Sequence, residues 1–167
     1  MKKIYRIIPD PSAPELILEG GLAERLVGES VTRLSPDRPF EGHVERLADW
    51  NQFYRVGTNA FALSEAAWDN CEQMYYALRE NSIEFPAVRT ASGDFAVIHP
   101  LQFLPQSHDP SQLCDLTYAS TIFRIRSRPP LEVFCLEGIA VPNDEIKRAC
   151  DIYGFTGLIF EEVWSGE

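Results

Sequence analysis

The sequence predicts a single domain of the α+β class, and three observations lead to this prediction. The 167 residues are enough for one domain with a hydrophobic core. Apolar side chains recur at helical spacing in two segments, at about 65–80 and 144–153. Two apolar segments around the turn "TASGD" are typical of a β-hairpin. We therefore expect a mainly antiparallel sheet on which the two helices pack.

The first part of this domain, residues 1–57, is expected to be irregular and rich in loops, because prolines and glycines are frequent there. Short strands are expected in it only at 3–8 and 16–18. Residues 58–167 hold the other predicted strands, at 83–88, 95–98, 121–126, 131–136 and 158–163. The strand at 121–126 alternates in character, which places Arg124 and Arg126 on a half-exposed basic face.

The helix at 65–80 is expected to begin after Ser64, whose hydroxyl can accept a hydrogen bond from a free N–H of the first turn. Its buried stripe is predicted from apolar residues at helical spacing. These residues are Trp68, Cys71, Tyr75 and Leu78.

The helix at 144–153 is expected to be capped by Asn143 and to end at a left-handed glycine, Gly154. Its predicted inner stripe consists of Ile146, Ala149, Cys150 and Tyr153. The glycines of "GFTG" follow a helix, whereas a phosphate-binding loop precedes one. This segment is therefore predicted to end the helix and to lead into the last strand.

No membrane partner is expected, because no segment approaches the roughly 20 apolar residues that a transmembrane helix requires. The start, "MKKIYRIIPDP", has too short an apolar run for a signal peptide, so we expect a cytoplasmic protein. The cysteines have no pair at metal-ligand spacing, and we interpret them as core thiols. They are Cys71, Cys114, Cys135 and Cys150.

No catalytic residue, metal ligand or cofactor is predicted. The sequence contains no GxSxG, HExxH, Walker or GxGxxG motif. None of His43, His99 and His108 has a partner at the spacing of a helical metal pair. The loop from His108 to Asp115 holds one local group of candidate ligands, which we interpret as a turn. Facing carboxylates cannot be identified from one sequence, so an enzyme stays the alternative.

The formal net charge is −10, and acidic residues dominate after residue 59 except in a basic stretch at 121–129. Such a chain repels phosphate backbones, so nucleic acid is not expected as a partner. A partner protein with a basic surface would be attracted to it. The alternative is that the acidity only keeps the domain in solution.

Several segments, taken in order along the chain, carry a family resemblance. They are Leu63-Ser64-Glu65, Ile83 to Val88, Asp115 with Ser120, Ile122 to Ile125, and Gly154 to Val163. In this order they resemble the DUF1629 family, also called the Imm11 or MXAN-0049-type immunity protein family. The resemblance covers roughly residues 45–165 and is best over 58–167.

This resemblance implies a bacterial immunity protein of a polymorphic toxin system. Such a protein binds and neutralises a cognate toxin, secreted or delivered by type VI secretion, by forming a stoichiometric complex in the cytoplasm. The neighbouring toxins in this family are often nucleases, so a nuclease is the expected target. Two alternatives stay open: a small enzyme that reverses the toxin's product or acts on a small substrate, and a regulatory binding module without a toxin.

The predicted toxin-binding face lies on the helix at 65–80, where acidic side chains share one side. It consists of Glu65, Asp69, Glu72, Tyr76 and Glu80. The carboxylates would repel one another until a basic surface opposes them, and the tyrosine would be an aromatic anchor. An ordinary solvated helix face is the alternative. A second candidate surface is the acidic C-terminal segment around Glu161 and Glu162.

Overall fold

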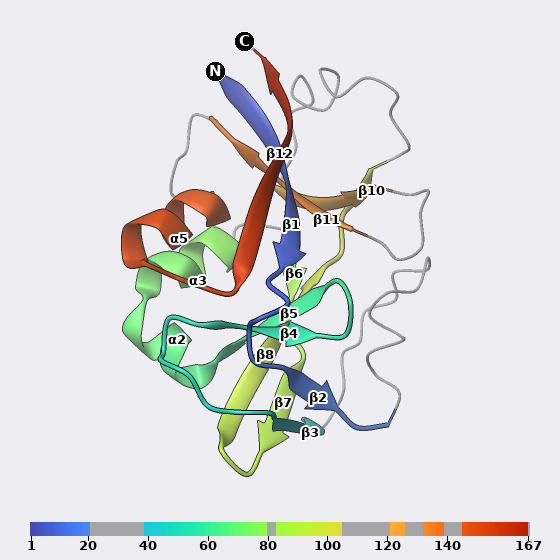
Figure 1. Ribbon diagram of the computed structural model, residues 1–167, viewed down its shortest axis with the longest axis vertical. Coiled ribbons are helices and arrows are strands. Elements are labelled where there is room, and N and C mark those ends of the chain that lie inside the picture. The colour runs from blue at the N-terminus through green and yellow to red at the C-terminus, as the bar shows by residue number, and fades with distance from the viewer. Residues whose placement is uncertain (21–38, 80–82, 105–120, 126–131, 139–144, 167) are drawn as a thin grey trace.

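The structure is a computed structural model that describes residues 1–20, 39–79, 83–104, 121–125, 132–138 and 145–166. Its strands form two sheets, which lie one above the other in Figure 1. The upper, five-stranded sheet has the strand order β12-β1-β11-β10-β9. Its strands are β1 (Lys2–Pro9), β9 (Phe103–Leu104), β10 (Ile122–Ile125), β11 (Val133–Glu137) and β12 (Leu158–Gly166).

The lower, seven-stranded sheet has the order β2-β3-β7-β8-β5-β4, with β6 also paired to β8. Its strands are β2 (Leu16–Leu18), β3 (Phe40–Val44), β4 (Phe53–Val56), β5 (Ala60–Ser64), β6 (Ile83–Glu84), β7 (Ala87–Thr90) and β8 (Gly93–Pro100). Its antiparallel centre runs β7-β8-β5-β4, and β4 and β5 form a hairpin.

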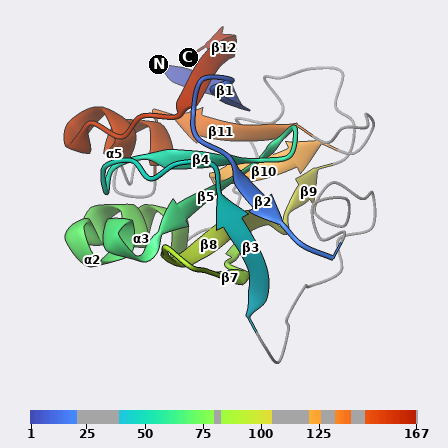
Figure 2. The same ribbon diagram turned by 60° about the horizontal axis from the view of Figure 1, so that its bottom comes forward.

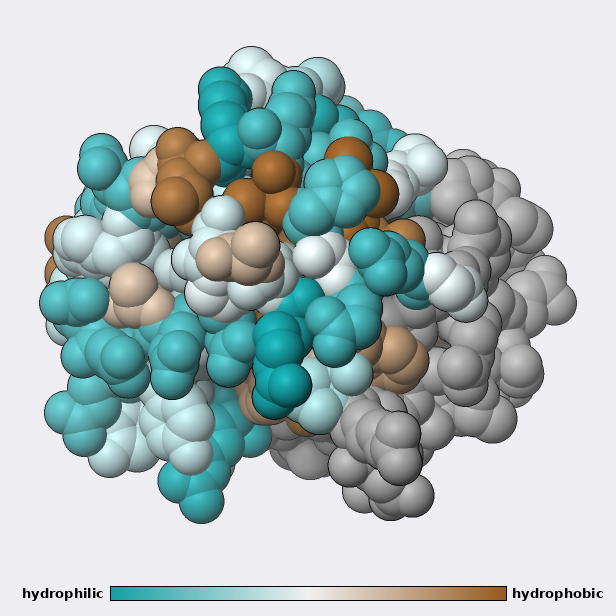
Figure 3. All heavy atoms as spheres, turned by 90° about the horizontal axis from the view of Figure 1, so that it is seen from below, coloured by the Kyte–Doolittle hydropathy of each residue, from teal (hydrophilic) through white to brown (hydrophobic). Residues whose placement is uncertain are grey.

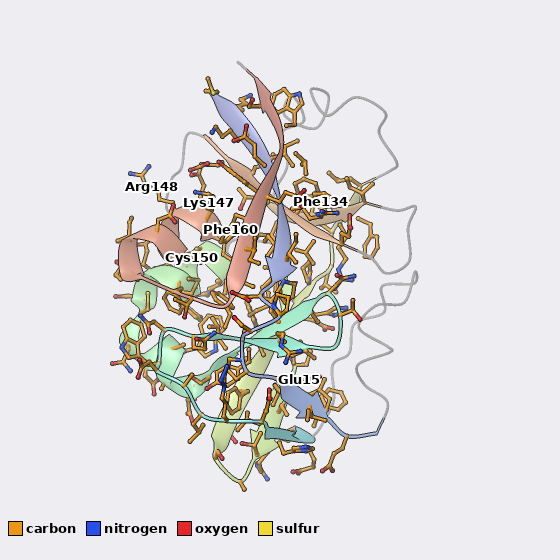
Figure 4. The ribbon with its side chains drawn as sticks, viewed as in Figure 1. Glu15, Phe134, Lys147, Arg148, Cys150 and Phe160 are labelled. Atoms are coloured by element: carbon orange, nitrogen blue, oxygen red, sulfur yellow. The ribbon has the colours of Figure 1, made fainter. Side chains whose placement is uncertain are left out.

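The helices α2 (Glu65–Asn70), α3 (Glu72–Arg79) and α5 (Ile146–Tyr153) lie together on one side of the molecule (Figures 1 and 2). The main core lies between these helices and the two sheets, and it includes Ile7, Leu63 and Ile98. A further cluster lies on the opposite face of the five-stranded sheet, where Phe123 stacks on Phe134 (Figure 4).

The α+β class predicted from the sequence is confirmed. The strands predicted at 3–8, 16–18, 95–98, 121–126, 131–136 and 158–163 are present, with ends shifted by a few residues. They are divided between two sheets, a division that the sequence pattern does not indicate.

The prediction that residues 1–57 are loop-rich is wrong for the described residues, because β3 and β4 lie there. β9 was also not among the predicted strands. The predicted strand at 83–88 is divided into β6 and β7 at Pro86, which has no N–H to donate. The carbonyl of Pro86 instead accepts a hydrogen bond of 3.0 Å from the N–H of Val97.

The helix predicted at 65–80 is interrupted at Cys71, which has φ −140° and ψ 86° and separates α2 from α3. Ser64 caps α2 as predicted, since its hydroxyl accepts the N–H of Ala67 at 3.3 Å. The predicted buried stripe is wrong in part, because the side chain of Tyr75 is 40% exposed and Trp68 is only partly buried. The buried residues of these helices and of the junction between them are Ala67, Cys71, Met74, Ala77 and Leu78.

The helix predicted at 144–153 begins at Ile146, and its N-cap residue is Glu145. The predicted cap, Asn143, lies outside the described residues. Ile146, Ala149 and Cys150 are buried as predicted, and Figure 4 shows Cys150 on α5, but Tyr153 is 39% exposed and does not belong to the inner stripe. Gly154 ends the helix in the predicted left-handed conformation, with φ 66° and ψ 32°.

We expect Gly154→Val to lower the free energy of unfolding by about 1 kcal/mol or more, because a left-handed backbone is unfavourable for a residue with a Cβ. The site has room for a side chain, since the nearest atom to an added Cβ is Asn51 Nδ2 at 3.7 Å. Gly154→Asn is the control and should cost less, because asparagine tolerates this conformation. Urea denaturation measures both, and equal losses would contradict the conformational explanation.

Met74→Ala should lower the free energy of unfolding by about 2–5 kcal/mol, since Met74 is completely buried in the main core. Its neighbour Tyr75 is the matched control: Tyr75→Ala should cost clearly less, because that ring is partly in solvent. The two variants can be compared by thermal and urea denaturation. A larger loss for Tyr75→Ala would show that the stripe originally predicted from the sequence is the correct one.

Candidate functional site

The acidic side chains predicted to bind a partner are on the surface of α2 and α3. Glu65 and Asp69 lie on α2, Glu72 and Tyr76 lie on α3, and all of them are exposed. Glu80 lies outside the described residues. Because the break at Cys71 separates the two helices, the single face predicted from a continuous helix is two adjoining short faces. We call Glu65, Asp69, Glu72 and Tyr76 the acidic face.

The structure brings Glu72 and Tyr76 together, since the hydroxyl of Tyr76 donates a hydrogen bond of 3.0 Å to Glu72 Oε1. This hydrogen bond and the negative charge of Glu72 raise the pKa of Tyr76 above its ordinary value. Tyr76 is therefore a neutral phenol at physiological pH, and it is 42% exposed.

A row of aromatic side chains adjoins the acidic face. The ring of Trp68 packs edge-to-face with the rings of Phe85 and Tyr75, with distances between ring centroids of 5.4 and 6.1 Å. Tyr75 in turn contacts Tyr76 at 5.8 Å, and the guanidinium of Arg79 lies 5.4 Å from the centre of the Tyr75 ring. The sequence interpretation missed the exposure of Tyr75 because it placed this ring in the core. We call Trp68, Tyr75, Tyr76 and Phe85 the aromatic row.

Among the described residues, the carboxylates of the acidic face form no ion pair, whereas several other carboxylates do. Glu15 and Glu45 lie near Arg55, at 3.9 and 3.6 Å, and Asp151 binds Lys147 at 3.0 Å. Within the described part of the chain, Glu65, Asp69 and Glu72 form no ion pair. Seen from below, the surface is mainly hydrophilic, with apolar side chains gathered toward its middle (Figure 3).

The second predicted surface, around Glu161 and Glu162, has a different electrostatic character. Glu161 forms an ion pair with Arg6, and Glu162 accepts a hydrogen bond of 2.9 Å from Lys3. The pairing with Lys3 lowers the pKa of Glu162. These carboxylates join β12 to β1 and are paired with the protein's own cations, unlike those of the acidic face.

A second polar cluster lies in the interior. His99 of β8 is 4% exposed, and its Nδ1 lies 2.6 Å from Glu84 Oε1 on the paired strand β6. Because a carboxylate only accepts, Nδ1 carries the hydrogen. Burial lowers the pKa of His99 below its ordinary value, although the hydrogen bond to Glu84 opposes this effect. The imidazole is therefore neutral at pH 7.

Arg124 belongs to this interior region, and the half-exposed basic face predicted for its strand is wrong at this position. The side chain of Arg124 is 1% exposed, and burial lowers the pKa of its guanidinium to about 10. The positive charge of Arg124 is one cause of the lowered pKa of His99. Arg126, predicted on the same face, lies outside the described residues.

The other candidate ligands are not gathered into a metal site. Among the described residues, no group of three or more His, Cys, Asp and Glu side chains is arranged to hold a metal ion. The loop from His108 to Asp115 lies outside those residues. Cys71, Cys135 and Cys150 are buried and free, and burial raises the pKa of each thiol, as expected of core cysteines. Across the described ranges, no helix is long and apolar enough to cross a membrane.

Comparisons of the chain with protein-family models, with curated proteins and with solved structures found no match. The function proposed below therefore depends on the sequence resemblance and on the geometry of the acidic face.

The stability of the protein should fall as the pH is lowered below about 6.5, because the pKa of His99 is lower in the folded chain than in the unfolded one. Between these two pKa values the unfolded state binds the extra proton, and each pH unit costs up to about 1.4 kcal/mol. His99→Gln should remove this component and flatten the curve in that window. Urea denaturation at several pH values measures it, and parallel curves for both proteins would contradict the prediction.

Proposed function

We propose that this chain is an immunity protein that neutralises a cognate toxin by forming a stoichiometric complex and that it is not an enzyme. The observation that carries the proposal is the acidic face, where Glu65, Asp69 and Glu72 are exposed beside exposed tyrosines and have no ion-pair partner among the described residues. The family resemblance and the net charge of −10 agree with it.

The chemistry of the acidic face suits a basic protein surface. Its carboxylates attract cationic side chains over long range, which speeds encounter and disfavours acidic partners. The nucleases expected from the resemblance bind phosphate and therefore carry basic clefts. Carboxylates on a folded surface would occupy the positions that phosphates take in such a cleft.

The aromatic row supplies the second property that interfaces need. Tyrosine and tryptophan are frequent among the residues that contribute most to binding, since each buries a large ring with little loss of conformational freedom. Tyr75 and Tyr76 are 40% and 42% exposed, so each has further area to bury against a partner.

Buried side chains anchor α2 and α3 in the main core, so the acidic face is already formed in the free protein. Ala67, Met74 and Leu78 have no exposed area and anchor α2 and α3 in the main core. A preformed surface loses little conformational entropy on binding, which favours tight complexes.

Charge reversal tests the proposal. Asp69→Lys combined with Glu72→Lys should slow association with the toxin encoded by the neighbouring gene at least about tenfold at low salt, and it should weaken the salt dependence of the rate. The stability of the protein should be nearly unchanged, because both side chains are exposed. Stopped-flow mixing measures the rates.

The matched control is Glu41→Lys with Asp94→Lys, which makes the same change in net charge at exposed positions of the seven-stranded sheet. This control should have a much smaller effect. Equal slowing by both variants would mean that only net charge matters, and wild-type rates for the Asp69/Glu72 variant would remove the acidic face from the interface. Protection by substoichiometric amounts of protein would instead favour the enzyme alternative.

A further inference from the structure

The guanidinium of Arg124 is buried without a counterion or hydrogen-bond acceptor in the described part of the protein. The side chain is 1% exposed, and none of its three nitrogen atoms has a hydrogen-bond partner there. The backbone is satisfied, since the N–H of Arg124 donates to the carbonyl of Gln102 at 2.9 Å. Only the side-chain nitrogen atoms of Arg124 therefore lack a hydrogen-bond acceptor among the described residues.

The strand register shows where this side chain points. In the antiparallel pair of β10 and β11, Arg124 lies opposite Val133, and Ile122 lies opposite Cys135. Ile122, Val133 and Cys135 all belong to the main core. Arg124 shares their face of the five-stranded sheet, so its guanidinium is directed into the protein, toward the region between the two sheets.

The polar groups of the His99–Glu84 pair do not replace a counterion, and the buried Oε1 of Gln102, which also has no hydrogen-bond partner among the described residues, is uncharged. His99 is close enough to sense the charge of Arg124, but its imidazole is neutral at pH 7 and donates from Nδ1 to Glu84. Neither His99 nor Glu84 forms a hydrogen bond with the guanidinium. A pKa that is lowered by burial agrees with this absence, because a bonded carboxylate would raise it.

An arginine in this position is costly unless an anion accompanies it. Taking a charge out of water is strongly unfavourable, and buried charges in proteins are paired or hydrogen-bonded. Arginine also keeps its charge under all physiological conditions, so it cannot escape the cost by losing a proton.

We propose that Arg124 anchors an internal binding site for a small oxyanion, between the two sheets and beside the His99–Glu84 pair. The planar guanidinium presents paired N–H groups that match two oxygen atoms of a carboxylate or a phosphate. The ligand class is thus a small carboxylate or phosphate that contributes one negative charge to the interior. This site is separate from the acidic face, and its test does not depend on a toxin.

Thermal unfolding in matched ionic strength tests the site, with inorganic phosphate, acetate and chloride as the probes. For a dissociation constant of about 0.1 mM, about 10 mM of the preferred oxyanion should raise the Tm of the wild-type protein by roughly 5–10 °C. Chloride should not do so. The anion that gives the larger saturable rise in Tm, phosphate or acetate, identifies the preferred ligand class. Ion chromatography of acid-denatured protein detects an oxyanion that was retained through purification.

Two variants make the result specific. Arg124→Met removes the charge with little change in length and should abolish the shift. Arg148→Met is the control, because Arg148 is exposed on α5 and points away from the body of the protein in Figure 4, so it should keep the full shift. In chloride alone, Arg124→Met should be at least as stable as wild-type protein that carries no oxyanion, since it replaces an unpaired buried charge with an apolar side chain.

Three results would overturn the proposal. One is a wild-type protein that neither responds to the oxyanions nor retains one. Another is an Arg124→Met variant with an undiminished shift, which would place the anion elsewhere. The third is an Arg124→Met variant that, in chloride, does not fold or is much less stable than wild-type protein shown to retain no oxyanion, because the guanidinium would then have its partner within the chain.

Discussion

The connection between α5 and β12 holds the two sheets together, and the arrangement of the other elements depends on it. In the segment 154–157, the carbonyl of Thr156 accepts a hydrogen bond of 2.8 Å from the N–H of Phe53. The N–H of Thr156 donates a hydrogen bond of 3.0 Å to the carbonyl of Asn51. The carbonyl of Gly157 accepts the N–H of Asp10 at 2.8 Å. Phe53 begins a strand of the seven-stranded sheet, whereas Asp10 follows β1 of the five-stranded sheet. One short segment is therefore bonded to both sheets, and Gly157 has to be a glycine because a Cβ there would collide with the carbonyl of Phe53.

This connection also determines where the helices lie. Phe155 packs against the rings of Trp50 and Phe53, at 5.6 and 5.5 Å, which fixes the end of α5 over the main core. The side chains that α2, α3 and α5 place in that core include three alanines, Ala67, Ala77 and Ala149. Small side chains allow close approach, so the large rings of the helices are left at the edge of the contact. Tyr75 and Tyr76 are left exposed at this edge, whereas Trp68 and Phe85 of the aromatic row are partly buried against the main core.

The local chemistry of the chain was sufficient to predict the elements that depend on neighbouring residues. The cap at Ser64, the left-handed Gly154 and most strands follow from such signals. The buried stripe was assigned to Trp68 and Tyr75 because large rings bury most area, although Ala67 and Met74 have an equally regular spacing. Choosing between these two stripes required the shape of the surface below the helix, which one sequence does not contain. The burial of Arg124 was missed for a similar reason: alternation along a strand does not tell which face is covered when a second sheet lies above it.

The ion pairs of the protein are unevenly distributed between the five-stranded sheet and the acidic face. The cations Lys3, Arg6 and Lys147 are used within the five-stranded sheet and α5, where they join strands and helix to neighbouring carboxylates. No such cation is paired with Glu65 or Asp69 in the described part of the chain. These two carboxylates are four residues apart on a helix of only six residues, where like charges disfavour the helix by about 0.2–0.5 kcal/mol. Asp69 also lies in the last turn, near the negative end of the helix dipole. The free protein thus has an electrostatic cost at Asp69 that no ion pair among the described residues offsets, and a basic surface bound there would relieve it.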